Sequence, residues 1–270
     1  MLQKQAKVQR NSWSIGADTM RRGFGKSSVW LALASEDISD QHKLTLLGPL
    51  WVLVSYFAFT LTFIFIFGRS EGEKDYPTYV AIGLMLWLYM LEVVTKGIML
   101  FNGEESMIKG TPLPLSVYVF RLSAQCVMRG AYALFGCLII MVITGPPFEV
   151  FWFLSLVSII LVVLITPAAI TLLAITGAYF PDMRFVVSNA MRLGMFLTPV
   201  FWTNPGQDSV RAFLSDWNPF AWFLNLARGP VLDGNFPANI LLQCTALGLV
   251  LWLLAIVLLG RTANRIPFIL

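Results

Sequence analysis

Residues 104–121, EESMIKGTPLPLSVYVFR, are a charged and proline-containing segment that lies between two long apolar stretches. The chain has 270 residues, of which 57% are hydrophobic and only 13% are charged. A soluble domain carries about 25% charged residues, so this composition excludes a soluble fold. We therefore interpret the chain as an integral membrane protein, and residues 104–121 as a cytoplasmic segment on which a partner protein acts.

The apolar stretches predict an all-α membrane protein with six transmembrane helices. A spanning helix needs about 20 apolar residues, and the candidates cover residues 46–67, 79–100, 116–144, 151–179, 185–202 and 240–260. The third and fourth are longer than a span requires, so they are expected to tilt or to leave the membrane. Pro167 is expected to kink the fourth. Residues 28–270 are thus expected to form one transmembrane domain after a polar, partly ordered cytoplasmic tail at residues 1–27.

The distribution of Lys and Arg predicts the orientation of these spans. Basic residues concentrate in the cytoplasmic segments of membrane proteins. With the N-terminus inside, the outer segments hold only Arg69, Lys74, Arg211 and Arg228. The inner segments and helix ends hold the remaining basic residues: Lys4, Lys7, Arg10, Arg21, Arg22, Lys26, Lys43, Lys96, Lys109, Arg121, Arg129, Arg184, Arg192, Arg261 and Arg265. Both termini and residues 104–121 are therefore expected to be cytoplasmic.

Residues 28–43 have the pattern of an amphipathic helix at the inner membrane surface. One side is apolar, and the other carries charges. Packing against cytoplasmic loops is the alternative, and it places the helix on the same side of the membrane. The apolar side comprises Trp30, Leu31, Ala34 and Ile38, and the charged side comprises Glu36, Asp37, Asp40 and Lys43.

Residues 203–239 are expected to lie outside and to dip back into the outer leaflet as short re-entrant helices. The segment is too apolar for a solvated loop and too short for two further spans. Re-entrant backbone is stable only where protein or a watery cavity shelters it. The segment is therefore interpreted as a lid over a pathway, with a surface-lying amphipathic hairpin as the alternative.

Motifs for catalysis and for metal binding are absent from the sequence. Paired carboxylates, DxD, HExxH and Ser/His/Asp sets do not occur, and no ATP-binding motif is complete. Glu92 and Lys96 are four residues apart, which favours a neutralised structural pair over a coupling-ion site. We therefore expect no enzyme activity, no metal and no cofactor in this chain, and no binding of nucleic acid. The energy for any transport is expected to come from another polypeptide, which would bind ATP and Mg²⁺.

Aromatic residues recur near the expected helix ends and in the outer segment. Trp and Tyr at such depths commonly form interfacial belts. Alternatively, some of them line a conduit, where aromatic faces stack on sugar rings and let a chain slide. The candidate channel or gate aromatics are Trp51, Tyr56, Trp87, Tyr89, Trp202, Trp217 and Trp222.

The segment Ser106–Arg121, with its run MIKGTPLPL, resembles the "LIK-x-x-PLPL" region of the permease subunits of polysaccharide ABC exporters. Within them it is most similar to the O-antigen (Wzm-like) permeases, and capsule and teichoic-acid permeases are related. Further similarities follow in the same order from residue 28 to the end of the chain. They lie in Glu36–Trp51, Phe196–Trp202, Asn218–Trp222, Ala227–Pro230 and Arg265–Phe268.

The resemblance implies a bacterial inner-membrane protein that forms a channel as a homodimer and is driven by two separate ABC ATPase subunits. The cargo would be a long glycan on an undecaprenyl-type lipid. Residues 28–43 would be the interface helix, represented by Trp30, Glu36, Asp37 and Lys43. The inner loop would carry the coupling helix, with Glu105, Ser106, Met107, Ile108, Lys109, Pro112, Leu113 and Pro114 at or beside the ATPase groove.

Two features depart from that family, and two other functions stay open. The tail before residue 28 is longer than the family requires. Gly110 stands where a polar residue is expected, which would soften the coupling helix. The alternatives are a membrane-embedded glycan polymerase or lipid-linked sugar transferase, and an ABC exporter of another lipid or drug cargo.

Overall fold

The computed structural model describes residues 12–71, 75–144, 150, 152–203 and 210–270, and these residues fold into helices without a strand. Five of the helices are long and apolar enough to cross a membrane. They are α3 (Leu50–Glu71), α4 (Tyr76–Gly97), α7 (Leu115–Thr144), α8 (Trp152–Tyr179) and α12 (Ala238–Thr262). Their ends lie within 4 residues of the expected ones, so the prediction of an all-α membrane fold is confirmed for these five spans.

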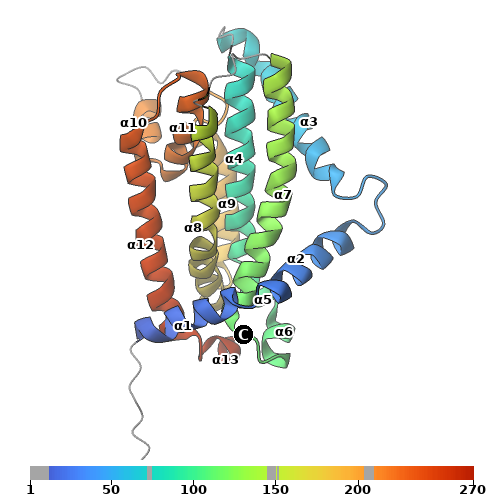
Figure 1. Cartoon of the computed structure of the whole chain (residues 1–270), viewed down its shortest axis with the longest axis vertical. Helices are drawn as coiled ribbons and strands as arrows, with labels where there is room; N and C mark the ends of the chain where they lie inside the picture. Colours follow the sequence, from blue (N-terminus) through green and yellow to red (C-terminus); the bar gives the residue numbers. More distant parts are fainter. Residues whose placement is uncertain (1–11, 72–74, 145–149, 151, 204–209) are drawn as a thin grey trace, which may run out of the picture.

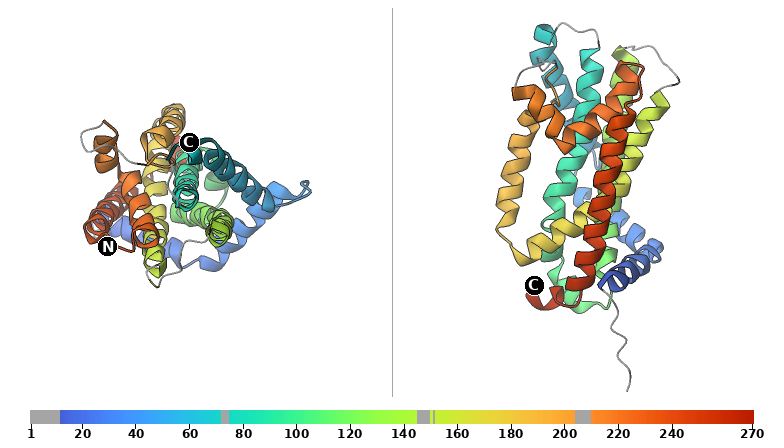
Figure 2. Two further views of the ribbon diagram at one scale, coloured as in Figure 1. Left: turned by 90° about the horizontal axis from the view of Figure 1, so that it is seen from above. Right: turned by 90° about the vertical axis from the view of Figure 1, so that its left-hand side faces the viewer.

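Helix α4 is the centre of the bundle, and α3 is at its edge. The apolar window of α4 is 67% buried, whereas that of α3 is 11% buried. Helix α4 packs against α3, α7, α8, α9 (Met183–Leu197) and α11 (Pro219–Leu232), while α3 leans away from the bundle (Figures 1 and 2). The exposed face of α3 is therefore free for lipid or for another chain.

The fifth expected span, residues 185–202, is not one helix. Helix α9 ends at Leu197, and Thr198 is extended with φ −96° and ψ 141°. The reason is Pro199, which lacks an N–H and disfavours helical backbone in the residue before it. With 15 residues, α9 is about 22 Å long, and the apolar core of a bilayer is about 30 Å thick.

Within the expected polar tail at residues 1–27, residues 12–24 form helix α1 (Ser12–Phe24), and residues 1–11 lie outside the described residues. Helix α1 lies across the end of the bundle (Figure 1) and packs on α12 and α7. The contact with α12 is very close: a Cβ added to Gly16 would lie 1.9 Å from the carbonyl oxygen of Ile256. Small residues at such a crossing let two backbones approach.

Helix α2 (Ser27–His42) follows and matches the helix expected at residues 28–43. Ala34 and Ile38 of its apolar side are buried against the bundle, but Leu31 is exposed. Helix α2 thus packs on α7 along part of that side.

The short helices separate into two groups at opposite ends of the bundle (Figure 1). One end holds α1, α2, α5 (Leu100–Gly103), α6 (Glu105–Gly110) and α13 (Ile266–Ile269). The other end holds α10 (Val210–Trp217) and α11. Pro167 lies inside α8, and the second half of α8 turns away from the first (Figure 2).

We expect Gly16→Ala to detach α1 from α12, because the new methyl group overlaps a backbone carbonyl. Overpacking of this kind costs about 1–3 kcal/mol. Limited trypsin digestion at Arg21 and Arg22 should then be faster, while the helical circular dichroism of the bundle is retained. Gly25→Ala is the control, because its nearest atom would be at an ordinary 3.4 Å. Equal cleavage of the two variants would contradict the close packing of α1.

Candidate functional sites at the two ends of the bundle

Helix α6 is a short helix with defined ends, as the sequence predicts. The Nζ of Lys109 lies 2.6 Å from Oε1 of Glu105, one turn earlier. The helix ends at Gly110, and Thr111 is extended with φ −129° and ψ 138° before Pro112. The hydroxyl of Thr111 donates to the carbonyl oxygen of Met107 at 2.6 Å, which closes the last turn.

The coupling residues expected on α6 do not share one surface. Glu105, Ser106, Lys109 and Pro112 are exposed, whereas Met107, Leu113 and Pro114 are half-buried. Ile108 is only 8% exposed and belongs to the hydrophobic core. Ile108 is therefore a packing residue, not an exposed docking residue. An Asp at this position would bury an unpaired charge, so we expect it to unfold the segment.

Arg121 joins α6 to α2. Its Nε and Nη2 donate to the two carboxylate oxygens of Asp37 on α2, at 2.5 and 2.6 Å. Its Nη1 donates to Oε2 of Glu104, immediately before α6, at 3.1 Å. The Arg121 side chain is 11% exposed, so these bonds are poorly screened by solvent, and loss of one partner leaves a buried charge uncompensated.

Two further side chains on the same face of α7 extend these contacts to α4. Gln125 donates to Asp37, and Arg129 donates to Glu92 of α4. Lys96 lies 2.7 Å from the same Glu92 carboxylate, so the expected pair is confirmed and gains a second cation. Residues 121, 125 and 129 are one turn apart, and we call this row of side chains the α7 ladder. The ladder connects α2, the start of α6 and the C-terminal half of α4.

The other residues expected on the interface helix have smaller roles in the fold. The Trp30 ring packs 5.8 Å from that of Phe120, and Glu36 is exposed. Lys43 pairs with Asp40 at 2.6 Å, but both side chains are largely in solvent. Such a pair contributes about 0–1 kcal/mol. Asp37 is the member of this set that links helices.

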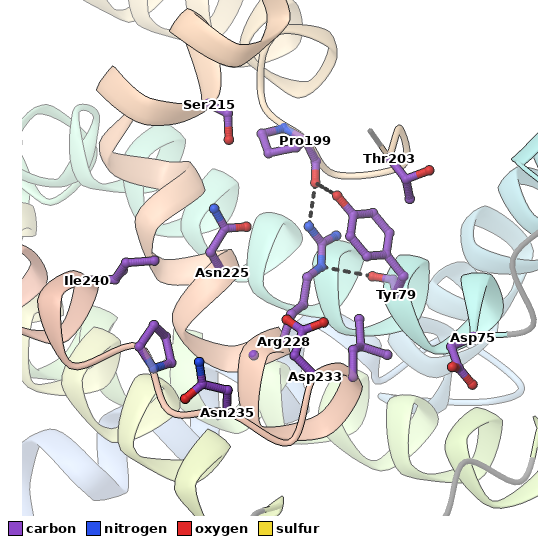
Figure 3. A pocket seen from close by; sticks show the side chains of 13 residues that line it. Asp75, Tyr79, Pro199, Thr203, Ser215, Asn225, Arg228, Asp233, Asn235 and Ile240 are labelled. Atoms are coloured by element: carbon purple, nitrogen blue, oxygen red, sulfur yellow. Dashed lines mark hydrogen bonds between the residues drawn. The ribbon is translucent and has the colours of Figure 1, made fainter. Parts of the chain in front are cut away.

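At the opposite end, Arg228 of α11 holds the segment that follows α9. It is only 3% exposed, and Nη1 and Nη2 donate to the carbonyl oxygens of Pro199 and Val200 at 2.5 and 2.7 Å. Its Nε donates to the carbonyl oxygen of Tyr79 on α4 at 3.1 Å, and its guanidinium lies 3.6 Å from the centre of the Tyr79 ring (Figure 3). Arg228 thus fastens α11, α4 and residues 198–203 together.

Two tyrosines of α4 hold the same segment. The Tyr79 hydroxyl lies 3.2 and 3.0 Å from the carbonyl oxygens of Pro199 and Trp202, which share its single proton as acceptors. The Tyr76 hydroxyl donates to that of Phe201 at 2.7 Å. Asn218 caps α11 through Phe220 N–H at 2.9 Å and donates to Thr198 at 2.8 Å. Because Pro199 ends α9, the carbonyl oxygens of the following residues have no helical partner. The two tyrosine hydroxyls supply hydrogen bonds to them.

A polar cavity of about 600 Å³ lies beside Arg228 (Figure 3). Its lining includes Asp75, Asn225, Asp233 and Asn235. The described residues hold no cluster of His, Cys, Asp and Glu that suits a metal ion. Within the described part of the expected re-entrant segment, residues 210–239, helices α10 and α11 both contribute to the lining of this cavity. Residues 204–209 of that segment lie outside the described residues.

The seven candidate channel aromatics lie in different surroundings. Tyr56, Trp87 and Tyr89 are buried among the helices of the protomer, where Tyr56 donates to the Ala81 carbonyl oxygen at 2.9 Å. The indole N–H groups of Trp202 and Trp222 donate to backbone oxygens of Phe196 and Asp216 at 3.1 and 2.7 Å. The exposed members are Trp51 and Trp217.

Helix α9 presents a polar stripe that the sequence analysis did not single out. Arg184, Ser188 and Arg192 follow at intervals of four residues, so they lie on one side. Arg184 and Arg192 are exposed, and Met191 is the buried residue of this helix. Charged side chains at membrane depth face a protein interior or a water-filled cavity. The single protomer supplies neither to Arg192 among the residues that are described.

We expect Gly83→Ala to displace Arg228 from its three carbonyl partners. A Cβ at residue 83 would lie 1.9 Å from Nη2 of Arg228 and 2.6 Å from the Val200 oxygen. Loss of hydrogen bonds to a buried charge costs about 1.5–3 kcal/mol each. The melting temperature of the purified protein should fall. Gly68→Ala is the matched control, because its nearest atom would be 3.6 Å away. Equal melting temperatures would argue against the role of Arg228.

Known proteins with similar sequences identify the family to which this chain belongs. The O-antigen export system permease protein RfbA of Klebsiella pneumoniae is 20% identical over 247 residues, which cover 89% of this chain and 94% of the relative. RfbA of Myxococcus xanthus is 20% identical, covering 86% of this chain and 91% of the relative. The polysialic acid transport protein KpsM of Escherichia coli is 23% identical, covering 84% and 90%. The ABC-2 type transporter model matches residues 30–232, and the chain therefore belongs to the ABC-2 type transporter family.

Proposed function

We propose that this chain is the transmembrane subunit of an ABC transporter that exports a polysaccharide across the bacterial inner membrane. Two copies form the channel, and a separate ATPase, with its ATP and Mg²⁺, binds the end that carries α6. The single observation that carries this proposal is the α7 ladder, which joins the exposed α6 to the core of an ABC-2 type bundle. The proteins that it resembles include named exporters of O-antigen and polysialic acid.

The coupling surface is the exposed side of α6. Glu105, Ser106 and Lys109 present polar groups to solvent, and the half-buried Leu113 and Pro114 lie next to them. A push on this surface reaches Arg121 through Glu104 and then reaches α2 through Asp37. The ladder passes the same displacement to Glu92 of α4. Because α6 is short and its last turn is closed by Thr111, it transmits a displacement better than a flexible loop does.

Helix α4 continues the path to the far end. Glu92 lies near one end of α4, and Tyr76 and Tyr79 lie near the other. These tyrosines hold residues 198–203 through hydrogen bonds. The same residues bind Arg228 and so help to position the two short helices above the cavity. A shift of α4 along its axis therefore changes both ends of the bundle, which is what ATP-driven opening of an outer gate requires.

The channel forms between two copies. Arg184, Ser188 and Arg192 of α9 need a wet or protein environment, and a second copy supplies it if the two stripes face a common axis. Phe185 and Phe196 are exposed next to this stripe. Aromatic faces beside polar groups suit a sugar chain that must slide. The cargo is a glycan on an undecaprenyl-type lipid, and both termini lie in the cytoplasm.

Lys109→Glu should weaken the ATPase complex, because it reverses the charge on the exposed side of α6 and opposes Glu105. Co-purification of the ATPase and export should fall together, by about tenfold if one salt-bridged contact of about 1.4 kcal/mol is lost. The melting temperature of the permease alone should be unchanged. Gly103→Ala, which meets no atom within 4 Å, is the control. Wild-type complex formation and export by Lys109→Glu would remove this face from the interface.

Glu104→Gln should uncouple transport while the complex still assembles. The substitution keeps the shape of the side chain but weakens its bond to Arg121, which is 3.1 Å long. ATP hydrolysis by the co-purified complex should continue with a large loss of export. If Glu104→Gln exports at the wild-type rate, the ladder does not carry the coupling.

Arg192→Cys should react with a charged, water-soluble thiol reagent in assembled transporters, because the proposal places residue 192 in a wet channel. Val186→Cys lies on another side of the same helix, is exposed, and should be shielded by lipid. The native Cys126, Cys137 and Cys244 are buried and give little background. Labelling that is faster at residue 186 than at residue 192 would place the wrong face of α9 toward the axis.

A further inference from the structure

An apolar groove of about 590 Å³ lies where α1 and α2 meet α7, α8 and α12. Its walls include Phe24, Leu31, Phe120, Val127 and Trp252. Helices α1 and α2, which supply part of this lining, run across the end of the bundle that also holds α6 (Figures 1 and 2). The groove is open along one side, and its walls suit a hydrocarbon chain.

Two polar groups at this groove lack a partner among the described residues. The Nε1 of Trp30 is buried and has no hydrogen-bond acceptor. A buried N–H without an acceptor costs about 1–3 kcal/mol. Arg21 also lines the groove, and no described carboxylate pairs with it, whereas its neighbour Arg22 lies 2.8 Å from Asp18. A cation and an N–H beside an apolar groove match an anion that carries a hydrocarbon chain.

We propose that this groove binds an anionic glycerophospholipid of the cytoplasmic leaflet. One acyl chain lies along the groove, the phosphate accepts hydrogen bonds from Arg21 and the Trp30 indole, and the second chain stays in the bilayer through the open side. The apolar walls do not suit a free phosphate ion or a sugar. Glycerophospholipids surround this surface at high concentration, so mass action favours them over a scarcer polyisoprenyl phosphate.

The bound lipid would stabilise the position of α2, the helix that binds Arg121 of the α7 ladder. Trp30 lies on α2 two turns before Asp37, which holds Arg121. The groove also includes residues of α7, the helix on which α2 packs, so an occupant contacts both α2 and its main support. Lipid binding at this position therefore makes the position of α2 depend on the composition of the inner leaflet. This consequence for transport depends on the proposed function, whereas the binding itself does not.

The test is native mass spectrometry of the full-length chain released from membranes that contain phosphatidylglycerol and phosphatidylcholine. The wild type should retain phosphatidylglycerol. Arg21→Gln should lower retention about fivefold, since one basic residue near an anionic surface contributes about 1 kcal/mol. Arg22→Gln, one residue away and paired with Asp18, is the matched control and should not change retention. Val127→Trp should fill the groove and abolish the retention of phosphatidylglycerol.

Three results would overturn the assignment: equal retention by Arg21→Gln and Arg22→Gln, equal retention of phosphatidylcholine and phosphatidylglycerol, or displacement of phosphatidylglycerol by equimolar undecaprenyl phosphate. The last result would assign the groove to an isoprenoid chain. Trp30→Phe keeps the ring and removes the N–H, so weaker lipid retention by this folded variant supports the hydrogen bond to phosphate. Because no step requires the ATPase or the cargo, failure of the transport proposal leaves the lipid result intact.

Discussion

The guanidinium group of Arg121 is the contact on which the α6 end of the bundle depends. It binds Asp37 and Glu104, so a single side chain fixes α2 relative to the start of α6. Neither helix is held there by extensive apolar burial, because most residues of α2 and α6 are exposed or half-buried. Ion pairs with little access to water are directional and break sharply when one partner moves. This suits a junction that must transmit displacement without forming part of the permanent core.

The other end uses an arginine in a different way. Arg228 has backbone carbonyl oxygens and a tyrosine ring as its partners, and no carboxylate among the described residues. Carbonyl oxygens carry only partial charge, so they leave most of the positive charge of Arg228 uncompensated beside the polar cavity. The difference has a structural cause. Pro199 ends α9 early and exposes carbonyl oxygens that need donors, and an arginine offers five N–H groups in one plane.

The sequence predicts the five long spans because the thickness of the bilayer demands length and apolarity, which composition reveals. It also predicts the pair of Glu92 and Lys96, because both lie on one helix. Arg129 was not foreseen as their partner, since contacts between helices leave no periodic signal. Helix α1 is not predicted, because it is short and the residues that it buries are Met20 and two glycines, Gly16 and Gly23. The early end of α9 was visible in Thr198–Pro199, but the apolar residues on both sides favoured a continuous span.

Helix α4 contacts an arginine at each end of the bundle, because Glu92 binds Arg129 of the α7 ladder and Tyr79 binds Arg228 of α11. Glu92 and Tyr79 are 13 residues apart on it, about 20 Å along the axis. Its window is the most buried of the five spans, so it cannot bend freely without disturbing neighbours on several sides. Close-packed interiors respond to a push by shifting between arrangements rather than by compressing. In the proposed mechanism, a displacement that enters through Arg129 reaches Tyr76 and Tyr79 along α4, and the least buried spans, α3 and α12, have room to accommodate it.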